Sequence, residues 1–210
     1  MIRYFNIVRL SVAVLFAGLS TDNAAAEKKL SLMIVAGGCF WCVKSDFDHV
    51  TGVVETILGY TGGHLKNPTY RDVTFGGSGH LEVVAIKYDP EKTDYATLLD
   101  VFWRSVDPTD GGGQFCDRRE SYSTAIYTTS PEQKKLAKAS QVALEASGVL
   151  KRSVATKTVD ASTFYPAEDY HQNYYRTNPL RYKFYRFNCG RDQRITDLWG
   201  DEAYKGIKKH

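Results

Sequence analysis

The chain has 210 residues, of which 43% are hydrophobic, and a formal net charge of +3. This length suits one domain plus a leader, and the hydrophobic share argues against wholesale disorder. The charges are spread along the chain, so no block of like charges marks a nucleic-acid-binding arm.

The first 26 residues show the three-part pattern of a signal peptide. Arg3 and Arg9 give a basic start, Leu10–Leu19 is a short apolar run, and residues 24–26 are alanines. Because a bilayer span needs about 20 residues, this run is too short for a comfortable transmembrane helix. We expect cleavage after the last alanine, which would leave residues 27–210 as an exported domain, periplasmic or secreted, with no stable membrane association. A retained N-terminal anchor is the alternative.

Apolar periodicity and turn residues in the rest of the chain predict one α+β domain. Two irregular loops, 64–79 and 107–120, are expected to lie over one site. We interpret the aromatic and basic stretch after Tyr165 as a packed C-terminal wrap with short helical pieces, rather than as an RNA-stacking surface. The other predicted elements are, in chain order, strand 30–36, helix 39–49, strand 53–60, strand 81–88, helix 93–105, strand 123–128, helix 131–146, strand 153–159 and helix 167–175.

Cys39 is the first candidate for a reactive residue. It follows two glycines, Gly37 and Gly38, which let the chain turn sharply between a buried strand and a helix. Unpaired N–H groups and the macrodipole at a helix N-terminus stabilise a thiolate, the nucleophilic form of cysteine. Phe40 and Trp41 would wall an apolar pocket beside this thiol. On spacing alone, a buried or disulfide-bonded cysteine is an equal alternative, and the two flanking aromatic residues favour the reactive cysteine.

Short motifs occur in a fixed order along most of the expected mature chain. They are Gly38-Cys39-Phe40-Trp41, Gly59-Tyr60-Thr61-Gly62-Gly63, Asn67-Pro68-Thr69-Tyr70, Gly79-His80-Leu81-Glu82, Phe102-Trp103, Asp107-Pro108, Asp117, Tyr122 and Tyr165-Pro166-Ala167-Glu168-Asp169-Tyr170-His171-Gln172. In this order they resemble the motifs of the A-type peptide methionine sulfoxide reductases. With this family we expect a two-layer α/β sandwich that has a mixed sheet, a ferredoxin-like plait core and long loops over the active site.

The resemblance implies that Cys39 attacks the sulfoxide sulfur and that Phe40 and Trp41 hold the substrate methyl group. It implies that Glu82 protonates the departing oxygen, which is a poor leaving group until it is protonated. An apolar pocket would keep this acid neutral, because burial disfavours the charged form of a carboxyl group. Without the resemblance, a solvent-facing glutamate on an edge strand is the simpler interpretation of Glu82.

The same resemblance assigns Tyr70 and Tyr122 to hydrogen bonds with the sulfoxide oxygen, and Asp117 to the organisation of the site. The residue types alone do not carry these roles. The chain has 14 tyrosines, so either tyrosine would otherwise be read as an ordinary half-buried side chain.

Attack would leave Cys39 as a sulfenic acid, which a second thiol converts to a disulfide. Cys42 lies three residues along, where helical Cβ atoms are about 5–6 Å apart, whereas a disulfide needs about 3.8 Å. This pair would therefore need a distorted first turn, and position 42 is more usually glycine in the family. Cys189 resembles the C-terminal recycling cysteines of the family, and Cys116 adjoins Asp117. We rank Cys189 slightly ahead of Cys42, and Cys116 third.

The resemblance implies reduction of the S epimer of methionine sulfoxide in proteins, for repair of oxidative damage, and the free amino acid is a further candidate substrate. We expect a monomer with no bound cofactor or metal that takes electrons from a thioredoxin-like protein or another dithiol. Its five histidines and single Cys-x-x-Cys pair do not form the paired clusters of structural zinc. Two alternatives remain: a thiol–disulfide oxidoreductase that uses Cys39 and Cys42, and a disulfide-stapled secreted binding domain.

Overall fold

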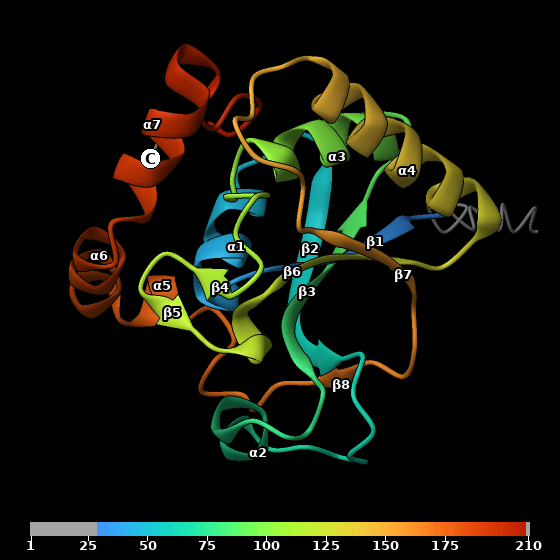
Figure 1. The fold of residues 1–210 in the computed structure, drawn as a ribbon. Helices are drawn as coiled ribbons and strands as arrows, with labels where there is room; N and C mark the ends of the chain where they lie inside the picture. The colour runs from blue at the N-terminus through green and yellow to red at the C-terminus, as the bar shows by residue number, and fades with distance from the viewer. Residues whose placement is uncertain (1–28, 209–210) are drawn as a thin grey trace, which may run out of the picture.

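The computed structural model describes residues 29–208, in which helices surround one six-stranded sheet (Figure 1). The expected leader, residues 1–26, lies outside this range. The elements are β1 (Ser31–Gly37), α1 (Phe40–Phe47), β2 (Val53–Thr61), α2 (Tyr70–Phe75), β3 (Leu81–Tyr88), α3 (Tyr95–Trp103), β4 (Gly113–Gln114), β5 (Asp117–Arg118), η1 (Glu120–Tyr122), β6 (Thr124–Thr128), α4 (Pro131–Ala146), β7 (Lys157–Asp160), β8 (Tyr165–Pro166), α5 (Tyr174–Thr177), α6 (Pro179–Asn188), α7 (Arg191–Trp199) and η2 (Gly200–Glu202).

The strand order in the large sheet is β7-β6-β1-β3-β2-β8. Neighbouring strands are antiparallel except β6 and β7, which are parallel, so the sheet is mixed as expected. Val35 of β1 lies opposite Val84 of β3 on one side and Ile126 of β6 on the other. These central strands are nearly continuous apolar runs because both of their faces are buried.

The two faces of the sheet pack against different parts of the chain. Met33 and Val35 face a large core shared with α1, α3 and α4, whereas Ile34 and Ala36 belong to a second core on the opposite face. This division follows from the two-residue period of a strand. The second core is closed by the segment after β7, which includes Phe164.

The helices predicted over 131–146 and 93–105 are present as α4 and α3, and each begins after a capping side chain. Ser130 caps α4, where its side chain accepts a hydrogen bond from the N–H of Gln133, and Pro131 occupies the first turn. Asp94 caps α3 by accepting from the N–H of Thr97. The structure confirms the predicted mixture of helices and strands.

Both segments predicted as irregular loops contain short regular elements. α2 lies within 64–79, and its N-terminus has a capping box in which Thr69 and Asp72 each accept from the other's backbone N–H. The β4–β5 hairpin lies within 107–120. Elements of two to six residues bury too little apolar surface to leave a periodic pattern in the sequence.

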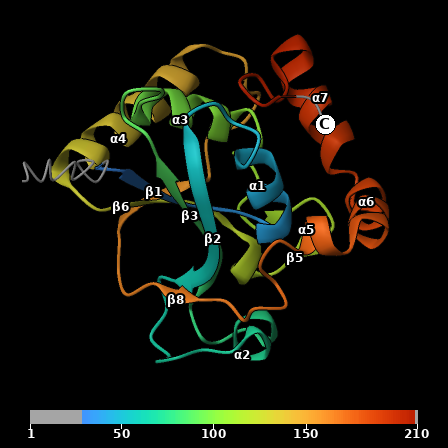
Figure 2. The same ribbon diagram turned by 180° about the vertical axis from the view of Figure 1, so that it is seen from behind.

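The predicted helix over 167–175 is wrong. Asn173 has a φ of 56°, a left-handed conformation that does not continue a right-handed helix, and α5 begins only after it. α6 and α7 follow, separated at Gly190. In Figures 1 and 2, these C-terminal helices lie beside α1 and the β4–β5 hairpin, on the opposite side of the molecule from α4. None of the helices within 29–208 combines the length and apolar character that a membrane crossing requires.

Candidate active site

Cys39 lies where β1 passes into α1, at the N-cap of that helix, and is 6% exposed. Gly38 adopts a φ of 80°, and a Cβ there would lie 2.6 Å from the Cβ of Gln114. A Cβ on Gly37 would lie 2.8 Å from a methyl group of Val43. Both glycines are therefore needed for the turn that presents Cys39, as their sequence predicts.

The pocket at Cys39 brings together residues from six separate stretches of the chain. Its lining includes all seven of the catalytic and substrate-binding residues predicted from the sequence, together with one tyrosine of α6 that was not predicted. The lining residues are Cys39, Phe40, Trp41, Tyr70, Glu82, Asp117, Tyr122 and Tyr185.

Glu82 is buried on β3 directly beside the start of α1. Its Oε2 accepts a hydrogen bond of 3.0 Å from the N–H of Phe40, the residue after Cys39. Burial raises the pKa of Glu82 to about 8, and the negative charge of Asp117 raises it further, while the Phe40 bond opposes the shift. Glu82 is therefore mainly a neutral carboxylic acid at neutral pH.

Tyr70 and Tyr122 bring hydroxyl groups to the same pocket. The Tyr122 hydroxyl interacts with both Glu82 and the hydroxyl of Tyr70. Burial raises the pKa of Tyr70 to about 12 and raises that of Tyr122 as well, so both phenols keep their protons. Glu168 holds Tyr70 in place by accepting from its backbone N–H at 2.8 Å.

The aromatic wall of the pocket is held on several sides. The Trp41 ring stacks on Tyr174 with a centroid separation of 3.9 Å, and its Nε1–H donates to Nδ1 of His171 at 3.2 Å. Because Nδ1 accepts this bond, the neutral imidazole carries its proton on Nε2. Burial lowers the pKa of His171 and keeps the ring neutral. The indole of Trp41 is therefore fixed by both stacking and hydrogen bonding.

The Cys39 thiol differs from the sequence expectation of a stabilised thiolate. Burial raises its pKa, and a hydrogen bond with the Cys42 side chain raises it further. The same bond lowers the pKa of Cys42, as do the positive charges of Arg186 and Arg191. Cys39 is therefore a protonated thiol in the free pocket, because the cost of desolvation exceeds the benefit of the helix N-terminus.

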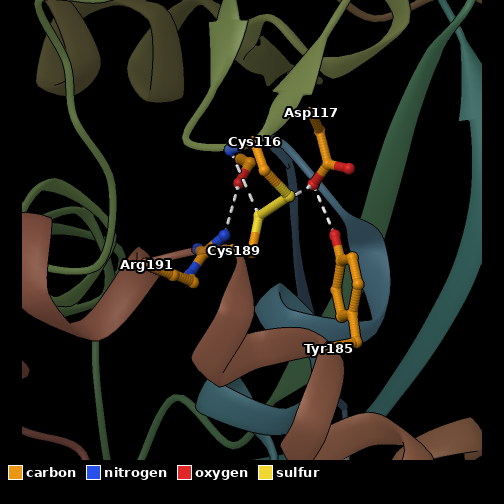
Figure 3. The surroundings of a disulfide bond; sticks show 6 residues. Cys116, Asp117, Tyr185, Cys189 and Arg191 are labelled. Carbon is orange, nitrogen blue, oxygen red and sulfur yellow. Dashed lines mark hydrogen bonds between the residues drawn. A yellow bond between two sulfur atoms is a disulfide. The ribbon is translucent and has the colours of Figure 1, made fainter.

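The four cysteines form two pairs. Cys39 and Cys42 are free, buried and packed in one cluster, whereas Cys116 and Cys189 are joined by a disulfide (Figure 3). Cys116, Cys189 and a carboxylate oxygen of Asp117 lie within 4.8 Å of one another, but the two sulfurs are bonded to each other and leave no thiolate for a metal.

Two comparisons of the sequence decide the family. A family model described as peptide methionine sulfoxide reductase matches residues 31–203. The chain is 52% identical over 183 residues to a peptide methionine sulfoxide reductase of Rhizobium meliloti (strain 1021), which covers 87% of this chain and 89% of that protein. The chain belongs to the peptide methionine sulfoxide reductase family. A further reductase, from Caulobacter vibrioides, is 49% identical over 195 residues, or 92% of this chain and 97% of that protein.

Solved structures of the family agree with this assignment. The reductase resembles methionine sulfoxide reductase A of Corynebacterium diphtheriae with a TM-score of 0.65 and 31% identity, over 74% of this chain and 78% of that one. It resembles reduced Mxr1 from Saccharomyces cerevisiae with a TM-score of 0.64 and 29% identity, over 72% and 87% of the two chains. The protein is thus an oxidoreductase that acts on methionine sulfoxide, as the motifs imply.

Family membership favours this reaction over the two alternatives raised by the sequence. Disulfide exchange at Cys39 and Cys42 would leave the buried acid Glu82 without a role, and a stapled binding domain would not need a free, pocket-lining thiol. Sequence reasoning missed Tyr185 and Tyr174, which lie in or behind the pocket. Both belong to a tyrosine-rich stretch with no spacing that distinguishes these side chains from their neighbours.

Proposed function

We propose that the reductase acts on the S epimer of methionine sulfoxide through Cys39 and Glu82. The Cys39 sulfur bonds to the sulfoxide sulfur while Glu82 gives a proton to the sulfoxide oxygen. The protonated oxygen then passes to the Cys39 sulfur as a hydroxyl group, so the substrate S–O bond and the bond between the two sulfurs both break. The proton of the attacking thiol restores Glu82. Methionine and a Cys39 sulfenic acid are the products, so the substrate gains two electrons and the cysteine loses two.

One observation carries this proposal. A buried carboxyl group whose pKa is raised to about 8 is hydrogen-bonded to the residue after the nucleophile, in the same pocket. Such an acid keeps its proton near neutral pH and donates it where negative charge develops. Tyr70 and Tyr122 supply further hydrogen-bond donors for the oxygen, and the ring of Trp41 provides an apolar wall for the substrate methyl group.

Cys42 is the resolving thiol in this scheme. Its sulfur attacks the sulfenic sulfur of Cys39, water leaves, and a Cys39–Cys42 disulfide forms. The side-chain hydrogen bond between the two cysteines supports this step. Cys189, which the sequence ranked first, is bonded to Cys116 instead, so the structure favours a different order with Cys42 ahead.

A dithiol then reduces the Cys39–Cys42 bond, and a thioredoxin-like protein is the expected donor. The N-terminal leader pattern and the disulfide of Cys116 support export to an oxidising compartment, where disulfides persist. A monomer acting on oxidised proteins remains part of the proposal. These assignments use the chain's own residues and require no prosthetic group.

The finer fold assignment also belongs to this proposal. The inner strands run β6-β1-β3-β2, with α1 between β1 and β2 and α3 between β3 and β6. This is the β-α-β-β-α-β order of a ferredoxin-like plait, which supports the expected core.

The reaction is tested by incubating the protein with separate S and R epimers of a methionine sulfoxide peptide and dithiothreitol. We expect methionine from the S epimer alone, and none from Cys39→Ser with either epimer. If wild-type protein reduces neither epimer but catalyses disulfide exchange, the proposed function is wrong.

A further inference from the structure

Two side chains of the pocket come from segments that are far apart in the sequence. Asp117 lies on β5, and Tyr185 lies on α6, 68 residues later. The Tyr185 hydroxyl donates a hydrogen bond to Oδ2 of Asp117, and its ring meets Trp41 edge-on. One wall of the pocket therefore depends on how the β4–β5 hairpin and α6 are held together.

The disulfide joins these same two segments beside Asp117 and Tyr185 (Figure 3). Cys116 immediately precedes Asp117, and Cys189 lies one helical turn beyond Tyr185, with its N–H donating to the Tyr185 carbonyl at 2.9 Å. The sulfur of Cys189 is 3.8 Å from Oδ2 of Asp117. The disulfide thus holds the residue directly before Asp117, and the Tyr185 hydroxyl holds the Asp117 carboxylate itself.

Other contacts attach the loop that contains the β4–β5 hairpin. Arg191 lies over the Phe115 ring at 4.8 Å, and Arg194 donates to Asp107 at 2.8 Å. On the other side, Arg119 donates to the carbonyl of Thr74. These contacts hold the loop on both sides of Asp117, and the disulfide holds the residue directly before it.

We propose that the Cys116–Cys189 disulfide is a clamp that positions Asp117 and Tyr185 in the substrate pocket, and that reducing it weakens substrate binding. Cys116 is exposed, so a dithiol reaches the bond from solvent. In this reaction the dithiol is oxidised to its own disulfide, and Cys116 and Cys189 each gain a hydrogen as thiols. The clamp rests on the proposed function, but it makes the reductase sensitive to redox state through cysteines that do not carry the oxygen.

The clamp is distinct from a relay in which Cys189 passes electrons to Cys42. A relay needs Cys189 alone, whereas a clamp needs both partners equally. Cys116→Ser, Cys189→Ser and the double variant therefore separate the two schemes. Tyr185→Phe removes the hydroxyl group and leaves the disulfide intact. Tyr95→Phe is the control, because it removes a buried hydroxyl on α3 that has no hydrogen-bond partner.

The measurement is a single turnover of an S-sulfoxide peptide without reductant, with methionine counted per enzyme at increasing substrate concentrations. Alkylation and mass spectrometry first establish that wild-type protein starts with Cys39 and Cys42 free and the other pair bonded. We expect the half-saturating concentration to rise about tenfold in either single variant, with a smaller change in the maximal rate. The double variant should match the single variants, and Tyr185→Phe should raise the half-saturating concentration in the same direction.

The pH profile gives a readout that a merely structural role would not change. The negative charge of Asp117 helps to raise the pKa of Glu82. Releasing Asp117 should therefore lower that pKa, and the rate of the first turnover (the burst rate) should begin to fall at a lower pH. Melting curves establish that each variant is folded at the assay temperature. Should a serine variant not fold, wild-type protein whose clamp has been reduced, together with Tyr185→Phe, provides the same comparison.

The clamp would be overturned if the serine variants kept the half-saturating substrate concentration of the wild type and lost their first-turnover rate at the same alkaline pH. A second result would also overturn the clamp and assign a relay. In that result, Cys189→Ser makes its first methionine at the normal rate but loses repeated turnover with a dithiol, whereas Cys116→Ser keeps both. Wild-type protein without a burst on the S epimer would instead overturn the proposed function on which the clamp rests.

Discussion

At the scale of single residues, the protonation of Glu82 should set the upper pH limit of activity. Its pKa is raised to about 8 by burial, so the acid form is present below that pH and is lost as the pH rises through it. Cys39 does not become a thiolate in this range, because burial raises the pKa of its thiol well above the usual range. We expect the burst rate to fall above about pH 8. A rate that is flat to pH 10 would contradict this role.

Replacing Glu82 by Gln should separate activity from stability. Loss of the acid should slow the burst by about 10²–10⁴-fold, which is the usual contribution of a general acid. Because the folded state holds the Glu82 proton more tightly than the unfolded chain, the wild type loses stability as pH rises from about 4.5 towards 8. A glutamine has no such cost, so the variant should melt at a higher temperature at neutral pH. A lower melting temperature would count against the raised pKa.

His171 should act on the substrate through Trp41. Its Nδ1 accepts the indole N–H, so His171→Ala frees one edge of the ring that forms the methyl-binding wall. We expect the half-saturating substrate concentration to rise about tenfold with a smaller effect on the maximal rate. His171→Asn keeps a possible acceptor and should recover part of this loss. Equal losses of maximal rate in both variants would contradict a positioning role.

At the scale of elements, the turn between β1 and α1 depends on Gly38. A side chain there would be in the left-handed region and would meet Gln114 at 2.6 Å. Gly148 has a similar φ of 67°, but a Cβ added at this position would have no other atom within 4 Å. Gly148→Ala should therefore lose only about 1–2 kcal/mol of unfolding free energy. Gly38→Ala should lose clearly more in urea titrations, and equal losses would contradict the account of this turn.

The disulfide should also stabilise the C-terminal helices. It closes a loop with a sequence separation of 73 residues, for which the chain-entropy model gives about 4 kcal/mol. We expect the double serine variant to lose up to this amount of unfolding free energy, measured by urea titration in the absence of reductant. Wild-type protein treated with dithiothreitol should approach the variant. No difference between the oxidised wild type and the variant would contradict a stabilising role for this bond.

At the scale of the whole molecule, sequence prediction succeeded where local signals or motifs were strong. The apolar runs of β1 and β3 and the Ser130 cap of α4 led to correct elements. The motif resemblance identified Glu82, which no residue pattern would separate from a surface glutamate. These features depend on a few neighbouring residues, or on a motif whose residues are close in the sequence.

Features that depend on distant contacts were not predictable. The Cys116–Cys189 bond joins residues 73 apart, and the cysteine pattern alone left three candidates for the resolving thiol. Tyr185 is one of many tyrosines until α6 is placed against the β4–β5 hairpin. The pKa of Cys39 was predicted in the wrong direction, because the helix N-terminus is visible in the sequence but the burial of the thiol is not.

The central claim is that Cys39 takes the oxygen and Cys42 resolves the sulfenic acid. Disulfide mapping by mass spectrometry after one turnover of the S epimer, without reductant, tests it most directly. The account predicts a new Cys39–Cys42 bond beside an unchanged Cys116–Cys189 bond. A Cys39–Cys189 or Cys39–Cys116 bond would contradict it, because the second pair would then have taken part in the reaction.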